Sequence, residues 1–63
     1  MTEYSAMLLD ADGAVIVMET DIPSFNLAKK QARTFFSDKE FRAAGGVCAE
    51  VWSASMCEYQ LKA

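Results

Sequence analysis

The sequence predicts an α+β protein in which four strands and one main helix follow the order ββαββ. Two observations support this class. Residues 24–36 are the one stretch that keeps the three- and four-residue apolar spacing of a helix face. Two runs rich in β-forming residues lie on each side of that stretch. At 63 residues, we expect a single domain over 1–63 with a small core.

Residues 3–10 and 14–22 predict a hairpin, because Asp12-Gly13 between two apolar runs is a strong turn signal. Two registers are compatible with the sequence. A two-residue turn at Asp12-Gly13 places Leu9 opposite Ile16, whereas a longer turn with a bulge places Leu8 opposite Ile16.

Both registers leave apolar side chains on the two faces of this hairpin. In the bulged register, one face carries Tyr4, Ala6, Leu8, Ile16 and Met18, and the other carries Met7, Leu9, Val15 and Val17. A single helix covers only one face. We therefore expect the second apolar row to be left to solvent or covered by another chain.

The predicted helix begins after Pro23, where Ser24 can accept a hydrogen bond from the backbone of Asn26 or Leu27, and extends to Phe36. The face predicted to cover the sheet consists of Phe25, Ala28, Ala32, Phe35 and Phe36. Lys29, Lys30 and Arg33 lie on the opposite face, where a solvated helix commonly carries its charges.

A second short helix is predicted up to Ala44. Ser37 and Glu40 have the spacing of a capping box, in which the serine bonds the N–H of Glu40, and Gly45-Gly46 provides a helix end. The alternative is one continuous helix over residues 24–44.

Residues 47–62 predict a second hairpin through Ser53-Ala54-Ser55, a turn that lacks the expected glycine. By alternation, the side predicted to face the helix holds Val47, Ala49, Val51, Cys57, Tyr59 and Leu61. Trp52 and Met56 then point away from the helix, beside the second apolar row of the first hairpin.

Charge is segregated along the chain, whose net charge is −3. Residues 1–23 carry −5, residues 24–44 carry +3 and residues 45–63 carry −1. We expect an acidic first hairpin and a basic helix surface, which attract partners of opposite kinds.

The residue types disfavour an enzyme. The chain has no histidine, which is the commonest general base and a common metal ligand. The run Asp10-Ala11-Asp12-Gly13 matches the start of a phosphatase or calcium motif, but the remaining parts of both are missing. We expect no catalytic residue, no metal site and no cofactor. Without an export signal or a long apolar run, Cys48 and Cys57 are predicted to be reduced thiols in the cytoplasm.

Leu8 to Val15 with its D-x-D-G turn, the alanine-rich helix and Glu50-Val51-Trp52 together resemble small bacterial and phage open reading frames of unassigned role. The resemblance implies the ββαββ order and no activity. In size and acidity the chain is also similar to small phage anti-defence proteins, including anti-CRISPR proteins.

These observations predict a non-enzymatic protein that binds another protein, such as a phage or mobile-element inhibitor of a host CRISPR component. The predicted partner-binding residues are Met7, Leu9, Val15, Val17, Trp52, Met56, Asp10 and Asp12. We also expect a homodimer through the same face. The alternative is a nucleic-acid-binding accessory protein that uses Lys29, Lys30 and Arg33, which the sequence pI of about 4.6 disfavours.

Overall fold

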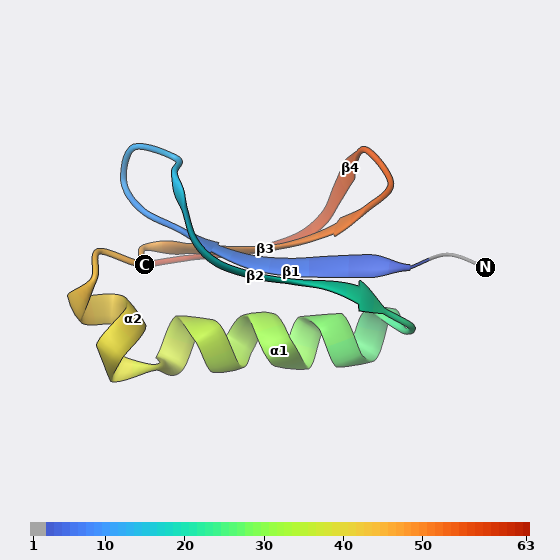
Figure 1. Ribbon diagram of the computed structural model, residues 1–63, viewed down its shortest axis with the longest axis horizontal. Helices are drawn as coiled ribbons and strands as arrows, with labels where there is room; N and C mark the ends of the chain where they lie inside the picture. Colours follow the sequence, from blue (N-terminus) through green and yellow to red (C-terminus); the bar gives the residue numbers. More distant parts are fainter. Residues whose placement is uncertain (1–2) are drawn as a thin grey trace.

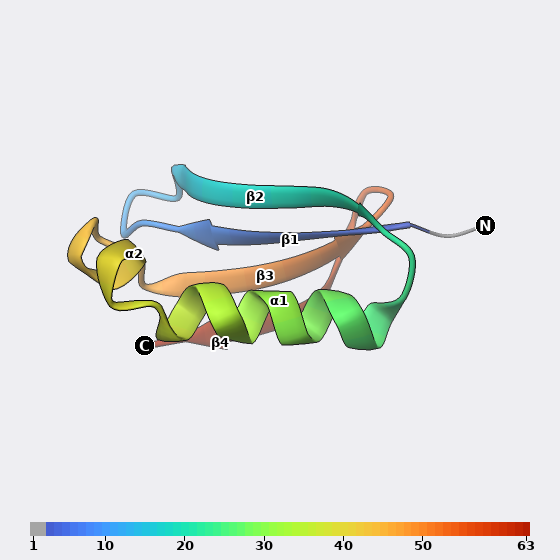
Figure 2. The ribbon, with the colours of Figure 1, turned by 60° about the horizontal axis from the view of Figure 1, so that its bottom comes forward.

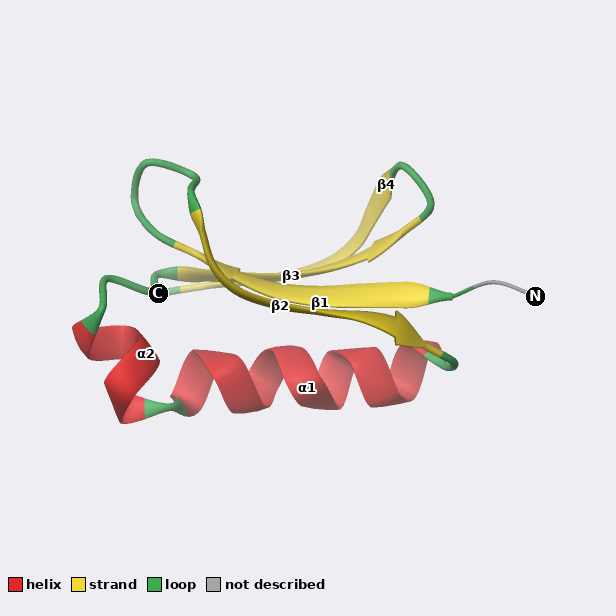
Figure 3. Ribbon diagram, in the orientation of Figure 1, coloured by secondary structure: helices red, strands yellow, loops and turns green. Residues whose placement is uncertain are grey.

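A computed structural model describes residues 3–63 of the chain. Four strands form one antiparallel sheet: β1 (Tyr4–Leu9), β2 (Val15–Ile22), β3 (Cys48–Ser53) and β4 (Met56–Lys62). Helices α1 (Phe25–Ser37) and α2 (Lys39–Ala43) lie on one side of it (Figure 1, Figure 3). The predicted ββαββ order and α+β class are confirmed, and the second short helix is present.

The strand order in the sheet is β2-β1-β3-β4. Strands β1 and β3 therefore form the centre, although they come from opposite halves of the chain, with Met7 opposite Glu50. Helix α1 packs mainly against these two strands and runs along the length of the sheet, in front of it in Figure 2. No helix or strand of residues 3–63 covers the other face of the sheet.

The core is narrow where α1 meets the sheet, because small side chains lie on both sides of the contact. Four fully buried alanines form this alanine seam: Ala6 and Ala49 on the sheet, and Ala28 and Ala32 on α1. Larger apolar side chains pack around it. Leu8 and Val51 are fully buried, and the rim is formed by Tyr4, Ile22, Phe25, Phe35, Phe36, Phe41, Tyr59 and Leu61. The helix face predicted from spacing is thus confirmed.

The first hairpin follows neither predicted register along its whole length. Met7 pairs with Met18, as the two-residue turn requires, but Leu9 pairs with Val15 because Ile16 is an extra residue in a bulge. The loop is longer than two residues. Asp10 Oδ1 accepts hydrogen bonds of 2.9 Å from the backbone N–H of Asp12 and of Ala14, which holds the loop closed.

The bulge also corrects the predicted faces. Val17 lies opposite the fully buried Leu8, so Val17 is half-buried and packs against the core on the helix side. Its predicted place on the uncovered face is wrong. Met18 takes that place, opposite Met7 and 51% exposed.

Helix α1 begins as predicted, with Ser24 Oγ accepting a 3.1 Å hydrogen bond from the Leu27 N–H. The predicted capping box at Ser37 is wrong. Ser37 belongs to α1 and donates its hydroxyl to the Arg33 carbonyl at 2.7 Å, while the Asp38 carboxylate accepts from Glu40 and Phe41 at the start of α2. Extended backbone at Asp38 separates the helices, so one continuous helix is excluded.

Helix α2 ends in a Schellman motif. The N–H of Gly45 bonds the Arg42 carbonyl at 3.0 Å and the N–H of Gly46 bonds the Phe41 carbonyl at 3.1 Å. Gly45 supplies the left-handed conformation, with φ of 104°, that such an ending requires. The predicted role of Gly45-Gly46 is confirmed at Gly45.

The second hairpin also contains a bulge. Val51 pairs with Tyr59, but Trp52 pairs with Cys57 because Glu58 is an extra residue on β4. Cys57 therefore shares the face of Trp52 and is exposed, so its predicted place toward the helix is wrong. Met56 lies opposite Ser53, so its predicted place beside Trp52 is also wrong. Val47 precedes β3 and is 37% exposed.

Within residues 3–63, neither helix has the length and apolarity that crossing a membrane requires.

Candidate protein-binding face

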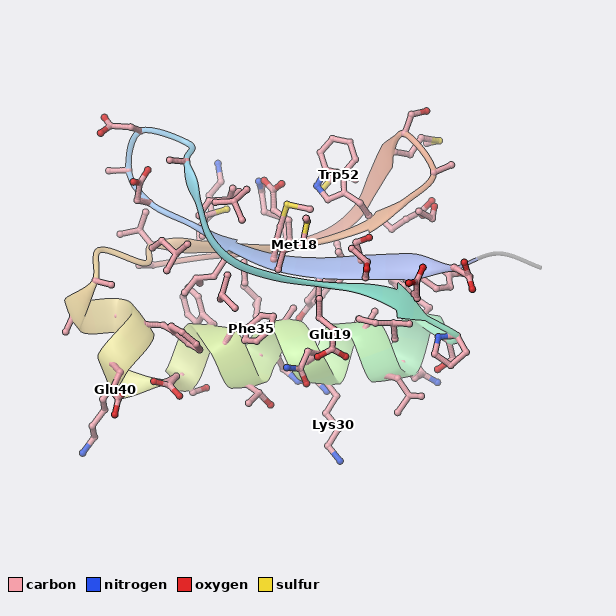
Figure 4. The ribbon with its side chains drawn as sticks, viewed as in Figure 1. Met18, Glu19, Lys30, Phe35, Glu40 and Trp52 are labelled. Atoms are coloured by element: carbon pink, nitrogen blue, oxygen red, sulfur yellow. The ribbon has the colours of Figure 1, made fainter. Side chains whose placement is uncertain are left out.

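The side of the sheet opposite α1 forms a continuous surface, which we call the open face. The register aligns its side chains in three rows across the strands. The middle row holds Met18, Met7, Glu50 and Gln60. The row nearer the loop between β1 and β2, which we call the first loop, holds Val15, Leu9, Cys48 and Lys62. The third row holds Ser5, Trp52 and Cys57. Trp52 and Met18 project from this face, away from α1 (Figure 4).

The half of the open face on β1 and β2 is apolar. Met7 and Leu9 are half-buried, whereas Val15 and Met18 are each 51% exposed. Leaving apolar side chains in contact with water is unfavourable, so covering them with a partner would be favourable. Methionine also adapts its shape to different surfaces. The predicted row is therefore present, with Met18 in place of Val17.

The half on β3 and β4 is organised around Glu50. Trp52 Nε1 donates a 2.8 Å hydrogen bond to Glu50 Oε1, and Gln60 Nε2 donates a 2.7 Å hydrogen bond to Glu50 Oε2. The hydrogen bond from Trp52 is the main cause that lowers the pKa of Glu50, and the bond from Gln60 acts in the same direction against partial burial. The carboxylate is thus ionised at neutral pH, and its hydrogen bond to Trp52 orients the indole ring.

Cys48 lies next to this carboxylate, with its Sγ 3.7 Å from Glu50 Oε2. Burial, and then the negative charge of Glu50, raise the pKa of the Cys48 thiol. This thiol is therefore a poor nucleophile at neutral pH.

Cys48 and Cys57 are both free thiols in the structure, and they share the open face and do not lie on opposite sides of the hairpin. Cys48 and the partner position of Cys57 are four residues apart on β3, which corresponds to about 13 Å along a strand. That spacing along the strand keeps the two thiols apart.

The open face is hollowed beside the first loop. A concavity of about 460 Å³ lies between that loop and β4, with Asp10, Glu50 and Lys62 among its lining residues. Both hairpin ends curve away from α1, so the sheet is concave on this side (Figure 1). Asp10 holds the loop, as described above, and Asp12 is exposed on it.

Reasoning from the sequence placed Trp52, Met7, Leu9 and Val15 on this face, but it did not include Met18, Glu50 and Gln60 among the predicted partner-binding residues. One available signal was the spacing of Glu50 and Trp52. Residues two apart on a strand point to the same face, so a glutamate can accept a hydrogen bond from the indole N–H. Which residues lie beside Met7 and Glu50 on the neighbouring strands, namely Met18 and Gln60, depends on the strand register and on the bulges.

The three predicted basic residues of α1 do not act as one patch. The Nζ atom of Lys29 lies 5.3 Å from the ring centroid of Phe25 and 5.1 Å from that of Tyr59. These cation–π contacts hold Lys29 against β4. Lys30 points away from the sheet (Figure 4), and Arg33 is exposed.

A smaller groove of about 330 Å³ separates β2 from α1, with Glu19, Leu27 and Lys30 among its lining residues. Its charged lining residues are one acid, Glu19, and one base, Lys30, and both side chains are exposed. Among residues 3–63, no three histidine, cysteine, aspartate or glutamate side chains gather as a metal site would require.

Comparison with protein-family models, with curated proteins and with solved structures finds no match for this chain.

Proposed function

We propose that this chain is a non-enzymatic protein-binding protein and that the open face is its binding surface. One observation carries the proposal. Residues 3–63 leave one whole face of the sheet uncovered, and this face combines an apolar half with a tryptophan that is oriented by a hydrogen bond to Glu50.

The composition of the open face supports this function. Tryptophan and methionine are enriched in protein interfaces, and tryptophan is among the commonest residues that contribute most of the binding energy. A side chain that is already ordered before binding loses less conformational entropy when a partner arrives. The hydrogen bond from Trp52 to Glu50 gives the indole this order. The raised pKa of Cys48 supports a binding role over a nucleophilic one.

The resemblance to small phage and bacterial proteins indicates the kind of partner. We propose a host protein in the bacterial cytoplasm, such as a component of a CRISPR defence, that is blocked when the open face covers part of its surface. An inhibitor of this kind needs a shaped surface and no chemistry of its own.

The test is co-purification of a host protein with two matched variants of the bait. Met18 and Leu27 are apolar and exposed to almost the same extent, 51% and 52%, but Met18 lies on the open face and Leu27 on α1. A host protein held through the open face is retained by wild type and by Leu27→Glu, and is lost with Met18→Glu. Retention by Met18→Glu, or no specific partner for wild type, contradicts the proposal.

A second copy of the chain is the other candidate occupant. The apolar half of the open face is an observation in its favour, because pairing two such faces removes both from water. Sedimentation of wild type at about 100 µM tests self-association, since a dissociation constant above this concentration corresponds to a binding free energy of only about 5 kcal/mol. A dimer that Met18→Glu dissociates and Leu27→Glu preserves supports self-association; a wild-type monomer rejects it.

A further inference from the structure

We infer that the partner of the open face carries an arginine or lysine side chain that binds the Glu50 carboxylate, surrounded by apolar residues that cover Met7 and Met18. This inference rests on the proposed function and specifies the chemistry of the partner. It follows from where the ionised group lies, and not from the overall acidity of the chain.

Glu50 lies within the open face and not at its rim. It is on the central strand β3, in the middle of the three rows, with Met7 on one side and Gln60 on the other. Any partner that covers the apolar half also removes water from this carboxylate. An ionised carboxylate that loses water without gaining a cation is strongly unfavourable. A basic side chain of the partner compensates for that loss.

The carboxylate has acceptor capacity left for such a cation. Two carboxylate oxygens provide about four acceptor positions. The indole N–H of Trp52 and the amide of Gln60 occupy two of them at 2.8 and 2.7 Å, and the thiol of Cys48 is a weaker third contact at 3.7 Å. The two strong donors also fix the direction in which the carboxylate points, so the acceptor is organised before the partner binds.

The neighbours of Glu50 suit a long basic side chain. Met7 and Met18 lie in the same row and offer an apolar surface for an aliphatic stem, and the Trp52 ring offers a surface for a guanidinium group. Asp10 lines the adjoining hollow and adds negative charge. Lys62, the cation of the open face on β4, is exposed and lies in the row nearer the first loop.

The same geometry disfavours a second copy as the occupant. A two-fold contact uses the same patch on both copies, so an axis that runs along the middle row places each Glu50 against its own copy. Two ionised carboxylates repel, and covering them makes the repulsion stronger. A foreign chain with a base at this position removes that conflict.

The experiment selects binders from a library of random twelve-residue peptides displayed on phage, with the intact chain as the target. We expect the selected peptides to carry arginine or lysine beside apolar residues. Their affinity should fall about tenfold or more for Glu50→Gln, because a hydrogen bond to a charged group is lost. Glu40→Gln removes the same charge from an exposed position on α2, on the helix side, and should leave the affinity unchanged (Figure 4).

A double-mutant cycle makes the test independent of any loss of folding in Glu50→Gln. Replacing the basic residue of the peptide by glutamine should weaken binding to wild type but have little further effect on Glu50→Gln. Peptides that depend on Met18 but carry no base and ignore Glu50→Gln would overturn this inference and leave the proposed function intact. If no selected peptide is weakened by Met18→Glu, the proposed function itself fails. A wild-type dimer through the open face also overturns the inference.

Discussion

Gly46 lies so close to Leu8 that a Cβ atom at position 46 would stand 2.5 Å from Leu8 Cδ2. The same atom would be 3.0 Å from the Phe41 carbonyl oxygen. Leu8 is fully buried on β1, so its side chain has no free space into which it can move. The end of α2 can therefore approach the sheet only because position 46 lacks a side chain.

We expect Gly46→Ala to lower the free energy of unfolding by roughly 1–3 kcal/mol, because it forces a buried leucine off its preferred position. Urea unfolding followed by far-UV circular dichroism measures the change. In a Leu8→Ala background the same substitution should cost less, because the side-chain clash is gone. An equal cost in both backgrounds would contradict a clash with Leu8.

The pKa of Glu50 can be read from the fluorescence of Trp52, the single tryptophan of the chain. Protonating Glu50 weakens the hydrogen bond to the indole, so we expect the emission to titrate with a midpoint below about pH 4.3, the ordinary value for glutamate. Glu50→Gln should abolish this titration and Glu58→Gln should preserve it. A midpoint at or above the ordinary value would show that the hydrogen bond does not persist in solution.

The lowered pKa of Glu50 also predicts the direction of a pH effect on stability. Its pKa is lower in the folded than in the unfolded chain, so the folded chain binds the proton less tightly. The stabilising contribution is present above the unfolded pKa and is lost as the pH falls through the folded pKa. Wild type should therefore lose more stability than Glu50→Gln when thermal unfolding is compared at pH 7 and below about pH 4.

The cap of α2 is tested by two neighbouring substitutions. Asp38→Ala removes the carboxylate that accepts hydrogen bonds of 2.8 and 3.2 Å from Glu40 and Phe41, so we expect a loss of about 1 kcal/mol. Ser37→Ala removes only a hydroxyl bonded back to Arg33 and should change the melting temperature little. A larger loss of stability for Ser37→Ala than for Asp38→Ala would instead support a capping box at Ser37.

The turn of the second hairpin holds Ala54 in the left-handed region, with φ of 51°. Glycine adopts this conformation without strain, so we expect Ala54→Gly to stabilise the chain by roughly 0.5–1 kcal/mol. The control is Ala44→Gly, where φ is −79° and the same substitution should destabilise. A lower melting temperature for Ala54→Gly would mean that the turn has another conformation in solution.

The parts of the fold that could be predicted from sequence are those with a strong local signal. Ser24 after Pro23 marked the helix start, and the spacing of Ala28, Ala32 and Phe35 identified the face that meets the sheet. The chain order of strands and helix followed from the same local patterns.

The faces of the strands could not be predicted completely, because the register shifts at two places in the first hairpin and at one place in the second. One extra residue shifts every later side chain on that strand to the other face. In β2, apolar residues occupy both faces, so the alternation of side chains gave no sign of the bulge at Ile16. Val17 was therefore predicted on the wrong face. In β4, the extra residue Glu58 moved Cys57 from the predicted core to the open face. The residues of the open face were predicted in outline, but Glu50, which accepts the hydrogen bonds from Trp52 and Gln60, was not among them.

The central position of β1 has a consequence for how the chain is made. Leu9 pairs with Cys48, so the strand at the centre of the sheet is synthesised well before its second neighbour exists. At ribosomal rates of roughly 5–20 residues per second, that interval is on the order of 2–8 seconds. During it, the first hairpin has one edge free and both apolar faces uncovered, so we expect the nascent chain to be most exposed to chaperones and proteases before β3 emerges.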